Sequence, residues 1–124
     1  MSSLSLDDNQ ASFQIRGFKP GEILINERII TQNLIVSPHQ LIEHWAPQRA
    51  DDIIYETLLP AMALKPLILL IGTGERQRFI ALEHYGALIN QGIGVELMST
   101  AAACRTYNAL SAEGREVVAA LILM

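Results

Sequence analysis

Hydrophobic positions in the second half of the chain form continuous runs separated by segments with helical spacing. Leu67–Ile71 is apolar at every position, Val95 and Leu97 mark another apolar segment, and Arg115–Leu123 closes the chain with a third. A strand that is apolar at successive positions is covered on both faces, as in the centre of a layered α/β sheet. The pattern therefore predicts a βαβ unit that is followed by one more helix and one more strand.

Two helices are predicted between these strands. The first spans residues 77–91, where four apolar side chains recur at three- and four-residue spacing, with Gly92 as its left-handed C-terminal cap. Ser99 or Thr100 caps the second helix, and Gly114 closes it. The inward face of this second helix is predicted to consist of Ala103, Cys104, Tyr107 and Leu110.

The N-terminal half has shorter apolar segments and more turn residues. The pattern predicts strands over Phe13–Phe18, Glu22–Ile25 and Arg28–Val36, joined by a turn at Lys19-Pro20-Gly21 and another at Asn26-Glu27. Three short strands with tight turns indicate an antiparallel β layer.

The middle of the chain is broken by prolines. We expect a short strand around Leu41, Ile42 and Trp45, with Trp45 as a core or sheet-covering residue and not a platform for a ligand. A short helix follows, capped by Asp51 or Asp52, and Pro60 is expected to end it or kink it.

The sequence thus predicts an α/β fold with three layers. Helices pack on a mixed central β-sheet, and the N-terminal segments form an additional antiparallel β layer. Residues 1–11 are expected to be a flexible tail, and residues 12–124 a single domain.

Composition excludes several classes of protein. Half of the 124 residues are apolar and the net charge is −4, which argues against a nucleic-acid partner and against an electrostatic membrane anchor. A single cysteine excludes an internal disulfide and a cysteine zinc cluster. The N-terminus lacks a signal-peptide pattern, and no apolar run approaches the roughly 20 residues of a bilayer span. We therefore expect a cytoplasmic protein without membrane insertion.

A glycine turn follows the first buried strand and offers one candidate site. Gly72, Thr73 and Gly74 precede a predicted helix, where bare backbone lets an anion approach a helix N-terminus. Glu96 lies about 20 residues on, as a ribose-binding acid does in dinucleotide folds. Gln77 occupies the place of the third glycine, however, and too few βα units follow. A tight turn at a strand end is the favoured interpretation.

The last helix offers polar side chains that extend this candidate site. Arg105, Thr106 and Asn108 lie on its less apolar side, and a parallel sheet would bring the start of this helix close to the glycine turn. These residues and the turn amides are then a candidate site for a small polar or anionic ligand. The competing interpretation is structural, with Arg105 paired to an acid such as Glu113 or bound to backbone carbonyls.

Other reactive side chains lack partners in the sequence. Cys104 lies on an apolar helix face without a recognisable histidine base, so a buried structural thiol is favoured over a nucleophile. His39 and His44 are five residues apart, which does not match a helical metal pair. No metal, cofactor or catalytic set is predicted, and we lean toward a protein without catalytic activity.

Three blocks together resemble a known family. They are the glycine turn within Leu69–Phe79, the segment Gly92–Met98, and Cys104-Arg105-Thr106-Tyr107-Asn108 followed by Glu113-Gly114-Arg115. In this order they resemble a small, largely uncharacterised family of bacterial and archaeal single-domain proteins that includes mitochondrial respiratory complex I assembly factor three. The resemblance extends from about Phe13 to the C-terminus.

The resemblance implies a three-layer α/β fold and no established enzymatic activity. It also implies a non-catalytic assembly or interaction factor with protein partners, among them subunits of a respiratory NADH dehydrogenase. The alternative function is a small-molecule or anion-binding domain, or a weak enzyme, with its pocket between the Gly72-Thr73-Gly74 turn and the Arg105 helix. A homodimer paired through an edge of the N-terminal β layer is a further expectation.

Overall fold

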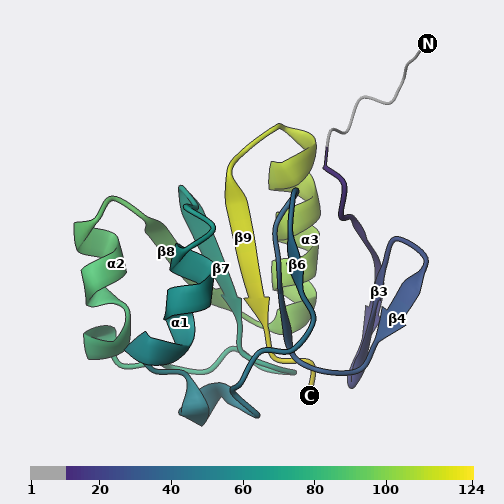
Figure 1. Cartoon of the computed structure of the whole chain (residues 1–124). Helices are drawn as coiled ribbons and strands as arrows, with labels where there is room; N and C mark the ends of the chain where they lie inside the picture. Colours follow the sequence, from purple (N-terminus) through teal and green to yellow (C-terminus); the bar gives the residue numbers. More distant parts are fainter. Residues whose placement is uncertain (1–10) are drawn as a thin grey trace.

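A computed structural model describes residues 11–124, which form two β-sheets and the helices packed between and around them (Figure 1). The predicted tail, residues 1–11, lies outside the described residues except for Ala11, which is buried. The α/β class, the mixed central sheet and the added antiparallel layer are confirmed.

Residues 11–124 contribute five strands to the central sheet, and the last of these in sequence lies in the middle. Its strands, in spatial order, are β6 (Leu41–Ile42), β5 (Leu34–Val36), β9 (Val117–Leu121), β7 (Ile68–Gly72) and β8 (Gly94–Met98). β7 runs parallel to both β8 and β9, whereas β5 is antiparallel to β6 and β9. The carboxyl ends of the three parallel strands therefore meet at one edge of the sheet.

The second sheet is the predicted antiparallel layer, but its third strand is shorter than expected. It contains β2 (Ile15–Lys19), β3 (Glu22–Ile25) and β4 (Arg28–Ile30). The predicted strand Arg28–Val36 is wrong, because the chain leaves this sheet at Thr31 and joins the central sheet as β5. Asn33 fixes the crossing: its amide donates to the Pro47 carbonyl (2.7 Å) and its Oδ1 accepts the Leu123 N–H (2.7 Å).

Helices cover both faces of the central sheet. Helix α1 (Tyr55–Met62) and the short α2 (Gly86–Asn90) lie over one face, and α3 (Thr100–Ala112) lies over the other, with the second sheet beyond it (Figure 1). Two hydrophobic cores result. The first joins α3 and both sheets, and the second joins α1 and α2 to the opposite face, where Trp45 is buried and donates to the Thr57 carbonyl (2.7 Å).

The helix predicted over residues 77–91 is wrong for most of its length. The chain forms only the 3₁₀ turn η2 (Leu82–His84) and then α2. The Thr73 hydroxyl accepts the Arg78 N–H (2.8 Å) and donates to the Arg76 carbonyl (2.8 Å), which ties residues 76–78 into a loop. Tyr85, with φ −132° and ψ 3°, separates η2 from α2. Gly92 is left-handed at φ +88°, as predicted.

The predicted aspartate cap of the middle helix is also wrong. Asp52 ends the 3₁₀ turn η1 (Ala50–Asp52), and its carboxylate accepts backbone N–H groups of Gln48 and Arg49 (3.0 and 3.3 Å). Ile54 precedes α1 instead, with its N–H bound by the Thr57 hydroxyl (3.0 Å). The helix continues past Pro60 to Met62, so the proline does not end it.

Helix α3 follows the prediction closely. The Ser99 hydroxyl accepts the Ala102 N–H (3.3 Å) as the N-cap, and Gly114 is left-handed at φ +77°. Ala103, Cys104 and Tyr107 are buried on its inward face, and Leu110 is half-buried there.

Candidate functional site

The glycine turn lies at the carboxyl end of β7, as predicted, and is closed by protein atoms. The Gly74 N–H donates to the Thr100 hydroxyl (2.9 Å), and this hydroxyl donates to the Ile122 carbonyl (2.5 Å). A Cβ at Gly72 would lie 2.9 Å from the same hydroxyl. Glycine is therefore needed here because the start of α3 packs directly on the backbone.

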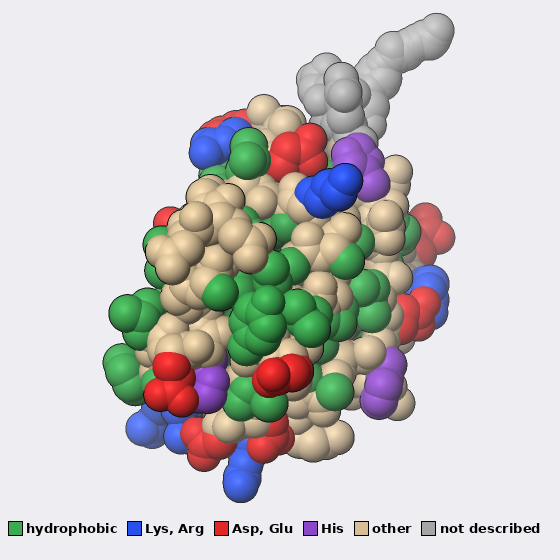
Figure 2. All heavy atoms as spheres, turned by 60° about the vertical axis from the view of Figure 1, so that its left-hand side comes forward, with side chains coloured by type: hydrophobic (Ala, Val, Ile, Leu, Met, Phe, Trp, Pro, Cys, Tyr) green, Lys and Arg blue, Asp and Glu red, His purple; other side chains and the backbone are tan. Residues whose placement is uncertain are grey.

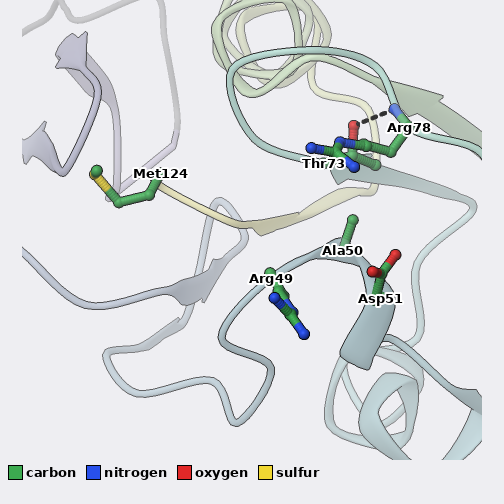
Figure 3. A pocket seen from close by; sticks show the side chains of 6 residues that line it. All are labelled: Arg49, Ala50, Asp51, Thr73, Arg78 and Met124. Atoms are coloured by element: carbon green, nitrogen blue, oxygen red, sulfur yellow. Dashed lines mark hydrogen bonds between the residues drawn. The ribbon is translucent and has the colours of Figure 1, made fainter.

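Thr73 is buried and used by the fold. Its hydroxyl serves the loop bonds to Arg76 and Arg78 described above and lies 3.2 Å from the Met98 carbonyl. A small cavity of about 120 Å³ lies beside it, lined by Arg49, Ala50, Asp51, Thr73, Arg78 and Met124. In Figure 3 the Arg78 side chain lies alongside Thr73, the Asp51 carboxylate faces the same space from η1, and the Arg49 side chain extends away from Thr73.

Asn108 has a structural task on α3. Its Oδ1 accepts the Ile15 N–H (3.1 Å) and its Nδ2 donates to the Ile15 carbonyl (2.6 Å), so one side chain binds both backbone groups of a β2 residue. The Tyr107 hydroxyl donates to the Phe13 carbonyl (2.7 Å) just before it. Together these bonds fix the second sheet to α3.

Arg105 is exposed and has no ion-pair partner among residues 11–124. Glu113, the acid considered for it, pairs with Arg115 instead (3.6 Å). At about 100° per residue, Thr106 lies across the buried stripe of α3 from the flank that carries Asn108. The three polar residues predicted on this helix therefore do not act on one side.

A groove between α3 and β2 brings Arg105 near another arginine. It has a volume of about 270 Å³ and is lined by Ile15, Arg16, Gly17, Phe18, Ala101, Cys104, Arg105 and Asn108. Arg16 lies at a β-bulge, where the β2–β3 register shifts between Ile15 and Gly17, and bulges commonly redirect a side chain. Like Arg105, it is exposed and has no ion pair within the described residues.

The predicted site residues therefore fall into separate places. Thr73 lines the cavity at the strand ends, whereas Arg105 and Asn108 line the groove beside β2. Arg16, Arg49 and Arg78 were missed by sequence reasoning. Arg16 could have been noticed as a polar residue within the alternating segment Phe13–Phe18. Nothing in the sequence indicates that Arg49 and Arg78 line the same cavity.

The cysteine and histidines show no catalytic arrangement within residues 11–124. Cys104 is 5% exposed, and burial raises the pKa of its thiol to about 12, with the Arg105 charge acting weakly in the opposite direction. The His44 ring bonds to the Gln32 amide oxygen (2.6 Å). In this part of the chain, no three His, Cys, Asp or Glu side chains cluster to hold a metal ion.

An exposed apolar surface covers the side of the molecule that carries α1 and α2. Five of the eight large exposed hydrophobic side chains in the described residues belong to this region, which we call the α1–α2 surface: Ile54, Leu59, Phe79, Leu82 and Ile89. Phe79 is 86% exposed and Leu82 59%. Figure 2 shows hydrophobic side chains gathered near the middle of this face, with charged side chains mostly at its margins.

A hollow lies next to Phe79 within this surface. It has a volume of about 290 Å³ and is lined by Ala50, Asp51, Ile53, Phe79, Ile80, Ala81 and His84. Exposed apolar side chains beside a hollow are typical of protein contact surfaces. The sequence pattern placed Leu82 and Ile89 on one apolar face of a single helix. In the structure Leu82 lies in η2 and Ile89 in α2, and both side chains are exposed.

Comparison with known proteins identifies relatives along nearly the whole chain. Residues 15–122 match the family described as "Protein of unknown function (DUF498/DUF598)". A Francisella tularensis protein named "13 kDa major membrane protein" is 33% identical over 125 residues, covering 98% of this chain and all of that protein. None of the helices formed by residues 11–124 has the length and apolar character needed to cross a membrane.

Vertebrate relatives carry an assembly-factor name. The zebrafish (Danio rerio) protein named NADH dehydrogenase (ubiquinone) 1 alpha subcomplex assembly factor 3 is 34% identical, with 98% of this chain and 71% of that protein covered. The human protein of the same name is 32% identical, but this chain spans only 58% of its length.

Solved structures share the fold. A Bordetella parapertussis protein is similar at 38% identity and a TM-score of 0.85, covering 90% of this chain and 96% of that one. A Bordetella pertussis protein described as an Mth938-like domain has 32% identity and a TM-score of 0.83, covering 98% and 92%.

Proposed function

Because the chain belongs to the DUF498/DUF598 family, whose relatives include proteins named as assembly factors, we propose that it is a non-catalytic interaction factor for a respiratory NADH dehydrogenase. The observation that carries this proposal is the α1–α2 surface. Phe79 exposes 86% of its surface beside a hollow of about 290 Å³, and a partner side chain would fill that hollow while covering the aromatic ring.

The chemistry of the sites agrees with a binding role. The Thr73 hydroxyl and the Gly74 amide are occupied by bonds within the protein, and burial moves the pKa of the Cys104 thiol still further above neutral pH. These groups serve the fold, while the α1–α2 surface presents unpartnered apolar side chains.

The proposal is tested by capturing partners from the host's own extract with tagged full-length protein. Three baits are compared: wild type, the double variant Phe79→Ser/Leu82→Ser, and Ile29→Ser. Ile29 is a matched control, because it is 63% exposed but lies on β4 of the other sheet. We expect NADH dehydrogenase subunits with wild type and Ile29→Ser and at least a tenfold loss with the double variant.

Two results would contradict this function. If the amount of captured NADH dehydrogenase subunits does not exceed the background on untagged resin, the assembly role is rejected. Equal retention by all three baits would show that the α1–α2 surface is not the contact.

A second function rests on the groove between β2 and α3. Arg16 and Arg105 face it from two elements without ion pairs in residues 11–124, and Phe18 adds an aromatic wall. Such a groove suits a small anion with an apolar body, because two guanidinium groups bind carboxylate or phosphate. Binding of benzoate and of inorganic phosphate, followed by NMR, should weaken in Arg16→Ala and Arg105→Ala but not in Arg115→Ala. Equal response in all variants would reject this function.

A further inference from the structure

Among the described strands, β8 forms one edge of the central sheet and is paired on one side only. Its single neighbour within residues 11–124 is β7, which runs parallel to it from Ile68 paired with Gly94 to Gly72 paired with Met98. The opposite edge strand, β6, has only two residues, so β8 is the longer of the two edges. A sheet edge carries unpaired backbone groups that another chain can bind.

The direction of the backbone groups follows from two bonds. The Gly94 N–H donates to the Leu67 carbonyl, and the Met98 carbonyl accepts the Thr73 N–H (both 2.9 Å). Alternate residues of a strand face the same neighbour, so Glu96 also directs its backbone toward β7. Val95 and Leu97 therefore direct two N–H and two C=O groups away from the sheet, and no hydrogen bond to these groups comes from the described residues.

Side chains on the two faces of β8 differ in character. Val95 and Leu97 are half-buried in the core beneath α1 and α2, and β8 contacts α2 directly. Glu96 lies on the α3 face of the sheet, where it is exposed and has no ion pair within residues 11–124. An added strand would therefore meet an apolar face continuous with the α1–α2 surface and, on its other face, one carboxylate.

A second copy of this chain fits the edge poorly. An antiparallel pair that uses both outward-facing residues would align Val95 with Leu97 of the other copy. Glu96 would then lie directly opposite Glu96 of that copy, and like charges at opposed positions destabilise a strand pair. The same geometry favours a cation at this position.

We propose that the outer edge of β8 binds an extended segment of a protein partner that carries lysine or arginine opposite Glu96. This inference rests on the proposed interaction role and names the mode of binding. The segment adds a sixth strand: its backbone bonds to Val95 and Leu97, its basic side chain pairs with Glu96, and its apolar residues continue toward α2 and Ile89.

The test uses two blocked peptides, Thr-Val-Lys-Val-Thr and Thr-Val-Glu-Val-Thr, titrated into the isotope-labelled full chain and followed by NMR. We expect the lysine peptide to shift the Val95 and Leu97 amides and slow their hydrogen exchange. The Glu96 and Met98 amides are already bonded to β7 and should change little. The glutamate peptide should bind at least tenfold more weakly.

Charge reversal provides the decisive comparison. Glu96→Lys should exchange the preference, so that the glutamate peptide now binds better, while Glu56→Lys, an exposed acid on α1, should keep the wild-type preference. Absence of binding by either peptide, shifts at another surface, or binding that ignores the charge at position 96 would each overturn the proposal. A wild-type dimer that Leu97→Pro dissociates would also overturn it, in favour of a second copy.

The outcome is distinguishable from failure of the proposed function. Peptide binding at β8 without capture of respiratory subunits would reject the assembly role alone. Capture that depends on Phe79 and Leu82, without peptide binding, would reject the edge strand alone.

Discussion

Asn108 of α3 binds both backbone groups of Ile15 on β2, 93 residues earlier in the chain. The amide side chain takes the place of a neighbouring strand, so the bulged edge of the second sheet is satisfied by a helix residue. This contact helps to fix the second sheet against α3, and Asn108 and Ile15 both line the groove that contains Arg16 and Arg105.

Asn108→Ala should destabilise the protein. The substitution removes the partner of a part-buried N–H and a part-buried C=O of Ile15, which costs about 1–3 kcal/mol. Urea unfolding measures the change. Thr106→Ala, on the other flank of the same helix, is the control and should stay within about 0.5 kcal/mol of wild type. Equal effects of the two substitutions would contradict the assigned role of Asn108.

Gly72→Ala should destabilise through overpacking at the end of β7. The added methyl group would lie 2.9 Å from Leu121 Cδ2 and 3.0 Å from Thr100 Cα, and forced contacts of this kind cost about 1–3 kcal/mol. Gly94→Ala at the start of β8 is the matched control, because its nearest contact would be an ordinary 3.6 Å. Thermal unfolding of both variants should show a clear loss for the first only. A loss of similar size in both would mean that strand propensity, and not packing, is measured.

Stability should fall at alkaline pH in a way that depends on Cys104. Burial raises the pKa of this thiol from 9.0 to about 12, so the folded protein keeps a proton that the unfolded chain releases. The resulting stability is fully present below the unfolded pKa and is lost as the pH rises toward 12. Between about pH 8 and about pH 10, wild type should lose about 1 kcal/mol more than Cys104→Ala in urea unfolding.

Burial also raises the pKa of Tyr107, so this side chain contributes to the loss of stability at alkaline pH. Its contribution cancels in the comparison because Tyr107 is present in both proteins. The same loss of stability in wild type and Cys104→Ala would show that the Cys104 thiol does not stay protonated in the fold.

Phe79→Ser/Leu82→Ser should leave the fold intact while changing the surface. Both side chains are mostly exposed, so the free energy of unfolding should stay within about 1 kcal/mol of wild type. Binding of a hydrophobic fluorescent dye to the native protein should fall, since the α1–α2 surface loses its two most exposed apolar groups. Unchanged dye binding would place the accessible apolar surface elsewhere in the protein.

Sequence patterns predicted the elements that are fixed by one local rule. Continuous apolarity located β7 and β9, and helical spacing with a serine cap located α3. The helix predicted over residues 77–91 does not form as one helix, because hydrogen bonds from Thr73 hold the start of this segment in a loop. The Thr73 hydroxyl binds the backbone of residues 76 and 78, and no periodicity analysis weighs a bond of that kind against helix formation.

The candidate site was predicted only in its parts. Residue types placed Gly72 and Thr73 at a strand end and Arg105 on an exposed helix flank, and the structure agrees with each placement. Their separation into two places could not be foreseen, because it depends on the bulge at Arg16 and on the bond between Asn108 and Ile15. The first depends on how β2 pairs with β3, and the second joins residues that are 93 apart in the chain.

The central position of β9 has a consequence for synthesis. The other four described strands of this sheet are made before β9. Two of them, β5 and β7, pair with β9 and not with each other, so β9 joins the two halves of the sheet. Until residues 117–121 emerge from the ribosome, no strand pairing can join the β5–β6 hairpin to the β7–β8 pair, and each has an apolar strand without its β9 neighbour. The nascent chain therefore passes through a stage that invites chaperone binding, and folding must await its final strand.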